Sequence, residues 1–163
     1  MDAPRRAIAV GLLVVVCLSG CAGSGSDDDE GGGGPACEPP DPTTVSLATN
    51  IQPIFDASCA VAGCHLGPAP AFGLDLSPGN TVDDTVGVKS NQRNQLDLVK
   101  AGDPDASYLV RKCEGGPDIA GVLMPQGCGL PGTGGTGDNG ALCLSNDDIA
   151  AIRQWILECA LDN

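Results

Sequence analysis

Residues 51–65 of this 163-residue chain read Ile51-Gln-Pro-Ile-Phe-Asp-Ala-Ser-Cys59-Ala-Val-Ala-Gly63-Cys64-His65. An apolar helical pattern leads there into two cysteines and the only histidine of the chain. Positions five apart lie about 140° from each other on a helix, so Cys59 and Cys64 cannot share one helical face. The helix must therefore end between the two cysteines, where Gly63 is the residue best suited to an irregular turn.

A thioether completes this set of potential ligands, because Met124 is the only methionine besides the initiator. In a Cys-Xaa-Xaa-Cys-His run, two thiols add to the vinyl groups of haem and the adjacent imidazole becomes the proximal iron ligand. Here the spacer between Cys59 and Cys64 is two residues longer than in that run. A disulfide between them needs the same break in the helix, so geometry leaves thioether attachment and a Cys59–Cys64 bridge both open.

Residues 1–20 have the form of a bacterial lipoprotein signal peptide. Arg5 and Arg6 precede an apolar run that is too short to span a bilayer stably. The segment Leu18-Ser-Gly-Cys21 then resembles a lipobox, in which the cysteine is acylated and becomes the new N-terminus. Ala22, in place of an aspartate, favours the outer membrane. We expect a lipid anchor on Cys21 that holds the protein on the periplasmic side of the cell envelope. A plain signal peptide with a coincidental cysteine is the alternative.

Composition divides the rest of the chain into two parts. Residues 21–42 are rich in glycine, serine, proline and acidic side chains, which is typical of a flexible tether. Residues 43–163 form one expected domain of about 120 residues. The formal net charge of the chain is −13, and loss of the signal peptide removes Arg5 and Arg6. Nucleic acid is thereby disfavoured as a partner, and basic patches on other proteins are favoured.

The domain has few aromatic residues with which to build a core, namely two phenylalanines, one tyrosine and one tryptophan. Either a haem or a set of disulfides is expected to supply the stability that so few aromatic side chains cannot. Apart from Cys17 and Cys21, the cysteines are Cys37, Cys59, Cys64, Cys113, Cys128, Cys143 and Cys159. One of them stays unpaired whether or not two are used by haem, so an odd number of cysteines does not decide between haem attachment and a disulfide.

Two helices are expected before residue 120. The first begins with Thr49 or Asn50 as its N-cap and delivers the chain into Cys59. The second begins with Asp103 as its N-cap, has a proline at its first helical position, and ends near Cys113.

A third helix is expected from Ser145, whose N-cap pattern includes Asp148 three residues later. Its apolar stripe consists of Ile149, Ile152, Ile156 and Cys159, with Trp155 beside it. Strand signals are sparse, so the sequence predicts a small all-α domain of three or more helices with long loops. The Gly-rich loop before the third helix is long enough to need pinning, and a Cys128–Cys143 disulfide would supply about 3 kcal/mol.

These elements, in this order, resemble the cytochrome c-like domains of bacterial cell-envelope lipoproteins. The segments that carry the resemblance are Ile51-Gln-Pro-Ile-Phe, Cys59 to His65, Gly73-Leu-Asp-Leu, Gly102-Asp-Pro-Asp-Ala-Ser-Tyr-Leu, Leu123-Met-Pro and Ile149 to Ile156. The resemblance implies that the last helix packs on the first. It also implies one covalent haem c per chain, attached through Cys59 and Cys64, with His65 as proximal and Met124 as distal iron ligand. The implied function is one-electron transfer to and from redox partner proteins. A six-coordinate iron has no open position, so no enzymatic activity is expected.

Less specific interpretations stay open beside this one. The alternative function is a haem-free, disulfide-stapled cytochrome-like domain that serves as a binding or structural lipoprotein. His65 is then an ordinary surface or core histidine, and Met124 fills the core. A zinc site from His65, Cys64 and Cys113 is a further hypothesis, although the spacings match no familiar finger. A haem sensor or peroxidase-like enzyme follows if Met124 does not bind iron.

Overall fold

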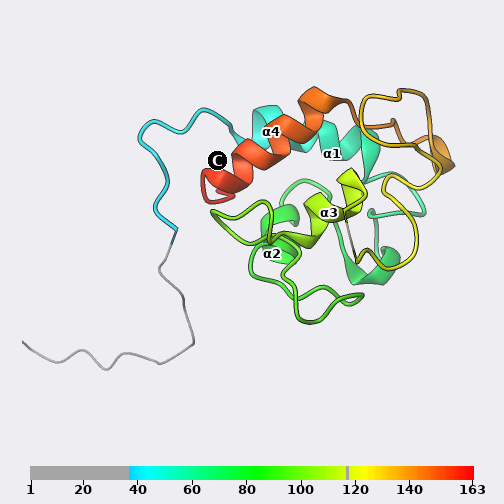
Figure 1. Cartoon of the computed structure of the whole chain (residues 1–163), viewed down its shortest axis with the longest axis horizontal. Coiled ribbons are helices and arrows are strands. Elements are labelled where there is room, and N and C mark those ends of the chain that lie inside the picture. Colours follow the sequence, from blue (N-terminus) through cyan, green and yellow to red (C-terminus); the bar gives the residue numbers. More distant parts are fainter. Residues whose placement is uncertain (1–36, 117) are drawn as a thin grey trace, which may run out of the picture. The chain divides into compact units, whose positions relative to one another are not determined.

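The structure, a computed structural model, describes residues 37–116 and 118–163 of the chain (Figure 1). The expected signal peptide, the acylated Cys21 and most of the expected tether lie outside these residues. The helical elements are η1 Leu47–Ile51, α1 Gln52–Ser58, η2 Ala71–Gly73, α2 Thr81–Thr85, α3 Tyr108–Glu114, η3 Asp138–Gly140 and α4 Asn146–Leu157. Within the described residues there are isolated β-bridges but no strands. The prediction of a small all-α domain is confirmed.

The first helical segment begins earlier than the sequence pattern predicted, so the assignment of Thr49 or Asn50 as N-cap is wrong. Ser46 lies in extended backbone, and its hydroxyl accepts a hydrogen bond from the backbone N–H of Thr49. Asn50 reaches back and accepts the N–H of Ser46 at 2.9 Å. This reciprocal pair satisfies two donors at the start of the first turn, and the N–H groups of Leu47 and Ala48 donate to Asn163. The first turn is π-helical in η1 before α1 continues.

The second predicted helix begins later than expected, because α3 starts at Tyr108 and not beside Asp103. The Asp103 carboxylate accepts the N–H of Ala106 at 3.0 Å, and the Ser107 hydroxyl donates to the Asp103 carbonyl at 2.9 Å. These bonds close a separate turn ahead of the helix. At its other end, α3 passes through Cys113 as predicted and stops where Gly115 adopts a left-handed φ of 72°.

The last helix, α4, has the predicted start. The Ser145 hydroxyl accepts the N–H of Asp148, and the Asp148 carboxylate accepts the N–H of Ser145 at 2.8 Å. The predicted membership of Cys159 in its stripe is wrong, since α4 ends at Leu157 and Cys159 has a φ of 73°. The sequence pattern also missed α2, whose five residues are too few for a periodic signal.

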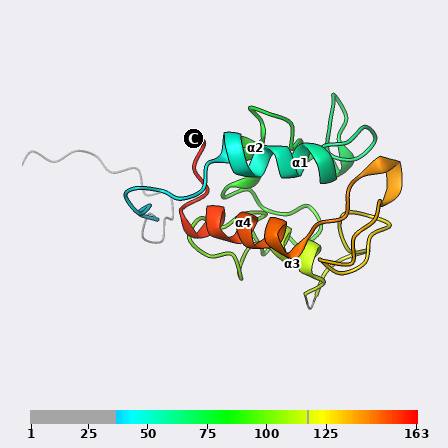
Figure 2. The same ribbon diagram turned by 90° about the horizontal axis from the view of Figure 1, so that it is seen from above.

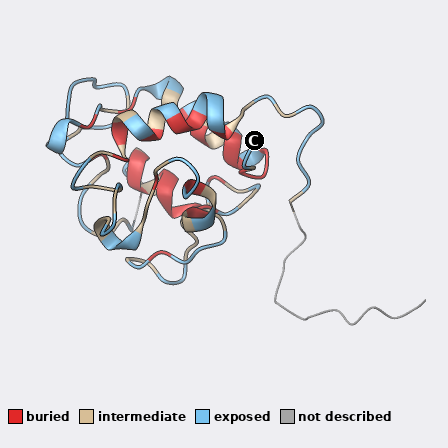
Figure 3. Cartoon of the chain, turned by 180° about the vertical axis from the view of Figure 1, so that it is seen from behind, coloured by how far each residue is buried: buried red, intermediate tan, exposed pale blue. Residues whose placement is uncertain are grey.

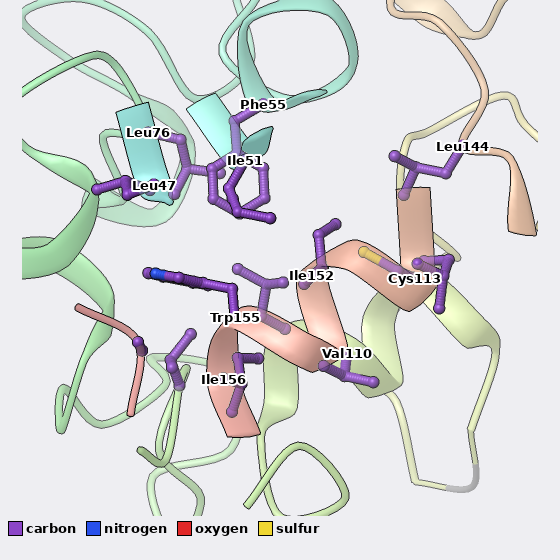
Figure 4. Close-up of a cluster of buried hydrophobic side chains, with 14 of the residues drawn as sticks. Leu47, Ile51, Phe55, Leu76, Val110, Cys113, Leu144, Ile152, Trp155 and Ile156 are labelled. Carbon is purple, nitrogen blue, oxygen red and sulfur yellow. The ribbon is translucent and has the colours of Figure 1, made fainter. Parts of the chain in front are cut away.

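The core lies between the first and last helical segments, which run side by side (Figure 2). The rings of Phe55 and Trp155 meet edge to face with centroids 6.3 Å apart. Ile51, Ile152 and Ile156 are almost fully buried around them (Figure 4). Helix α3 packs against α4, and each of these helices turns its buried residues inward (Figure 3). Helix α1 is thereby fixed in the position from which it delivers Cys59.

Two disulfides join distant parts of the described chain. Cys128 and Cys143 pair and tie the ends of the Gly-rich loop, which is the pairing that the loop's length made attractive, while Cys37 pairs with Cys159 just beyond α4. Disulfides form and persist in oxidising compartments, so this is an extracytoplasmic domain. Among the described residues, the helices are too short or too polar to cross a bilayer.

Candidate functional site

A mostly apolar cleft contains all four predicted ligands. It consists of two adjoining hollows, which share Cys59, His65, Phe72 and Met124 in their walls. The walls of one hollow come mainly from residues 72–76, residues 90–98 and α3. Cys64 lines the other, which we call the Cys64 hollow. Concave, mostly apolar walls are typical of sites for small molecules and cofactors. We name these two hollows together the cleft.

The cysteine pair reaches the cleft because α1 ends where the spacing predicted. Cys59 closes the last turn of α1, with its N–H donating to the Phe55 carbonyl at 2.8 Å. Gly63 then adopts a φ of +84°, and the Cys64 N–H donates to the Val61 carbonyl at 2.9 Å. This turn brings both side chains to the cleft even though they cannot share a helical face.

Both thiols of the pair are free, as is the thiol of Cys113 on α3, within the part of the chain that the structure describes. The Cys59–Cys64 bridge that the sequence left open is therefore absent between these residues. Burial, with smaller effects of Cys113 and Cys64, holds the pKa of Cys59 well above its ordinary value. Burial also raises the pKa of Cys113 to about 12.

His65 is held so that one ring nitrogen is left for a ligand. Its Nδ1 lies 3.2 Å from the carbonyl oxygen of Leu74, which can only accept, so Nδ1 carries the proton. Nε2 is then the unprotonated nitrogen that a metal ion can bind. Burial lowers the pKa of His65 more strongly than its backbone hydrogen bonds raise it, which favours the neutral ring. A neutral, oriented imidazole is the form that ligates a metal.

Met124 is brought to the cleft by the loop that follows α3. Its N–H donates to the carbonyl of Lys112 at 2.8 Å, and its side chain lines both hollows. The next residue, Pro125, is buried and lines the Cys64 hollow. The loop therefore presents the thioether from a fixed backbone position.

Three further residues of the cleft were not singled out from the sequence. Tyr108 and Lys112 are buried in its wall one turn apart on α3. Phe72 lies at its rim with 61% of its surface exposed and an unusual left-handed φ of 57°. A lysine on a helix is ordinarily a solvated surface residue, so nothing in the sequence marks Lys112 as part of a cleft. The position of Phe72 depends on a local turn that likewise has no signal in the sequence.

The proposed zinc site finds no support. Within the described residues, no group of three or more histidine, cysteine, aspartate or glutamate side chains is placed to hold a metal ion. Comparison with known proteins adds no identification, since no family model, no curated protein and no solved structure matches this chain.

Proposed function

We propose that this protein is a monohaem c-type cytochrome that carries single electrons in the cell envelope. One observation carries the proposal. The cysteine pair, the only histidine and the only methionine besides Met1 line one apolar cleft. The pair stays reduced, whereas four other cysteines of the described chain are joined in two disulfides.

The residues of the cleft fit a covalently bound haem. Cys59 and Cys64 would hold the haem as thioethers: addition of a thiol across a vinyl group would form a sulfur–carbon bond and place the thiol hydrogen on the other vinyl carbon. Such an addition releases nothing and consumes no oxidant, but it requires both cysteines to be free thiols, as they are. His65 Nε2 and the Met124 sulfur would be the two protein ligands of the iron. A bound haem supplies one-electron exchange between ferrous and ferric iron.

The surroundings of the site suit an electron carrier. Apolar walls from Leu74, Leu76, Leu98 and Leu109 exclude water from the site, and a thioether ligand raises the reduction potential of the iron. The net charge of −13 favours basic patches on the redox partners. The lipobox at Cys21 supports a lipid anchor on the periplasmic side of the envelope, at the outer membrane.

The four-residue spacer between Cys59 and Cys64 favours one other candidate. It is a haem-free, disulfide-stapled domain that binds an apolar partner in the same cleft, whose rim exposes Phe72. In that case the cysteine pair plays no part in attachment.

Expression with the cellular haem-attachment machinery separates the two candidates. We expect a red protein whose denatured mass exceeds the polypeptide by one haem. Alkylation without reduction, followed by peptide mapping, should then modify Cys113 alone, whereas the haem-free chain should be modified at all three free thiols. Cys113→Ala is the matched control and should keep the haem, while Cys64→Ala should bind it through one thioether at most. A colourless protein, with the pair either alkylated or joined as a disulfide, would overturn the cytochrome proposal.

A further inference from the structure

We infer that Lys112 is the positioning residue that holds Met124 in place as the distal ligand, with Tyr108 assisting from the previous helical turn. This inference rests on the proposed haem function and adds to it the part of the fold that presents the distal sulfur.

Lys112 is a buried lysine that is partnered by backbone and not by an acid. Only 7% of its surface is exposed, and its Nζ donates to the carbonyl oxygens of Ala120 at 2.8 Å and Val122 at 2.5 Å. Lys112 takes part in none of the ion pairs among the described residues. Burying an ammonium group is unfavourable unless it is well hydrogen-bonded. Its bonds all go to the loop that carries Met124.

The main chain of the same residue completes the attachment. The carbonyl of Lys112 accepts the N–H of Met124 at 2.8 Å, so one residue of α3 binds the loop at three places. One turn earlier, the Tyr108 hydroxyl accepts the N–H of Ala120 at 2.9 Å and donates to the amide oxygen of Gln92 at 3.3 Å. The loop is thus bound on successive turns of one helical face.

Helix α3 is a rigid support for this loop. Val110 and Cys113 are buried in the core, and the first N–H groups of the helix donate to the carbonyls of Asp97 and Leu98 at 2.9 Å. By contrast, no described residue of the loop between α3 and Met124 is buried, and Val122 at its centre is 52% exposed. A ligand on a loop keeps its geometry only when a rigid neighbour holds it. Release of the Lys112 bonds is therefore expected to release Met124.

The test uses the full-length haem protein with three substitutions. Lys112→Met removes the side-chain donors while keeping the apolar length. Tyr108→Phe removes only the hydroxyl that bonds Ala120 and Gln92. Lys100→Met is the control for loss of an exposed lysine. We expect Lys112→Met to keep its covalent haem but to bind carbon monoxide in the ferrous state and to have a lowered reduction potential. Tyr108→Phe should change in the same direction and less. Lys100→Met should match the unmodified protein.

Amide hydrogen exchange on the haem-free chain gives a second readout. In Lys112→Met, the Met124 amide should exchange about tenfold faster, whereas amides in α4 should be unchanged. If Lys112→Met does not bind carbon monoxide, the positioning role is overturned. A lowered reduction potential would not rescue it, because loss of the positive charge alone lowers the potential. Unchanged exchange at Met124 would overturn it as well. A parent protein that carries no haem would instead overturn the proposed function, and the exchange experiment would still decide whether Lys112 holds the loop.

Discussion

The two disulfides should stabilise the domain by different amounts, because they close loops of very different length. Cys37 and Cys159 are 122 residues apart, whereas Cys128 and Cys143 are 15 apart. In the chain-entropy description, each cross-link removes conformational freedom from the unfolded chain in proportion to the logarithm of the loop length. The expected stabilisation is about 5 kcal/mol for the longer loop and about 3 kcal/mol for the shorter one.

The comparison requires two double variants, Cys37→Ala with Cys159→Ala and Cys128→Ala with Cys143→Ala. For a domain of about 120 residues, the losses correspond to decreases in melting temperature of about 20 °C and about 12 °C. Urea unfolding at 25 °C measures the same losses as free energies and gives the surface exposed from the slope. Since Cys159 is also a buried core residue, its truncation removes some packing as well.

The reduced parent protein is the control for this packing loss. With the disulfides reduced in the parent and in the variants alike, the loop-closure advantage disappears, so each reduced double variant should differ from the reduced parent only by the packing of the lost sulfurs. Equal losses for the two oxidised variants, or a larger loss for the Cys128–Cys143 variant, would refute the loop-length reasoning. Such a result would mean that native contacts of the Gly-rich loop, and not the length of the closed loop, dominate the contribution of the Cys128–Cys143 disulfide to stability.

Four other variants test the remaining assignments. Cys21→Ala should leave the chain unlipidated, so that it no longer pellets with membranes after a high-salt wash; continued pelleting would contradict the lipid anchor. Met124→Ala should keep its haem but bind carbon monoxide and show a lower potential, whereas His65→Ala should impair haem incorporation itself; an unchanged spectrum in Met124→Ala would rule it out as the distal ligand. Hydrogen bonds, chiefly from Thr44, lower the pKa of Glu158 from its ordinary value of 4.5 to about 2, so its stabilisation is present above pH 4.5 and is lost as the pH falls toward 2. In Glu158→Gln the melting temperature should therefore depend less on pH over that range than in the parent protein. An equal decrease in the parent and the variant would contradict this.

The sequence predicted those parts of the fold that depend on neighbouring residues. The capping box of Ser145 and Asp148 lies within four positions, and it set the start of α4 correctly. The same reasoning misplaced the start of the first helix, because two capping pairs overlap there and Ser46 precedes the residues considered. It misplaced the start of α3 because Asp103 closes a turn of its own before the helix begins.

Long-range pairings were beyond sequence reasoning. Parity could not assign Cys37 to Cys159, which lie 122 residues apart in the sequence. By contrast, Cys128 and Cys143 close a short loop, whose length suggested this pairing without deciding it. The four candidate ligands could be named because each is a rare residue type in this chain, and their gathering in one cleft depends on the fold.

Lys112 shows why part of the site could not be found in this way. A lysine in a helix is ordinarily a solvated surface residue, and the sequence offers no acidic partner that would mark it as buried. Its burial becomes favourable only because the loop after α3 returns and presents the carbonyls of Ala120 and Val122 to Nζ. The lysine and the loop therefore depend on each other. The described part of the loop before Met124 has no buried residue and is ordered by the lysine, while the lysine is satisfied only by the ordered loop. This mutual dependence links the stability of α3 to the position of Met124, so a substitution that loosens α3 is expected to displace Met124 before it affects the cysteine pair at the end of α1.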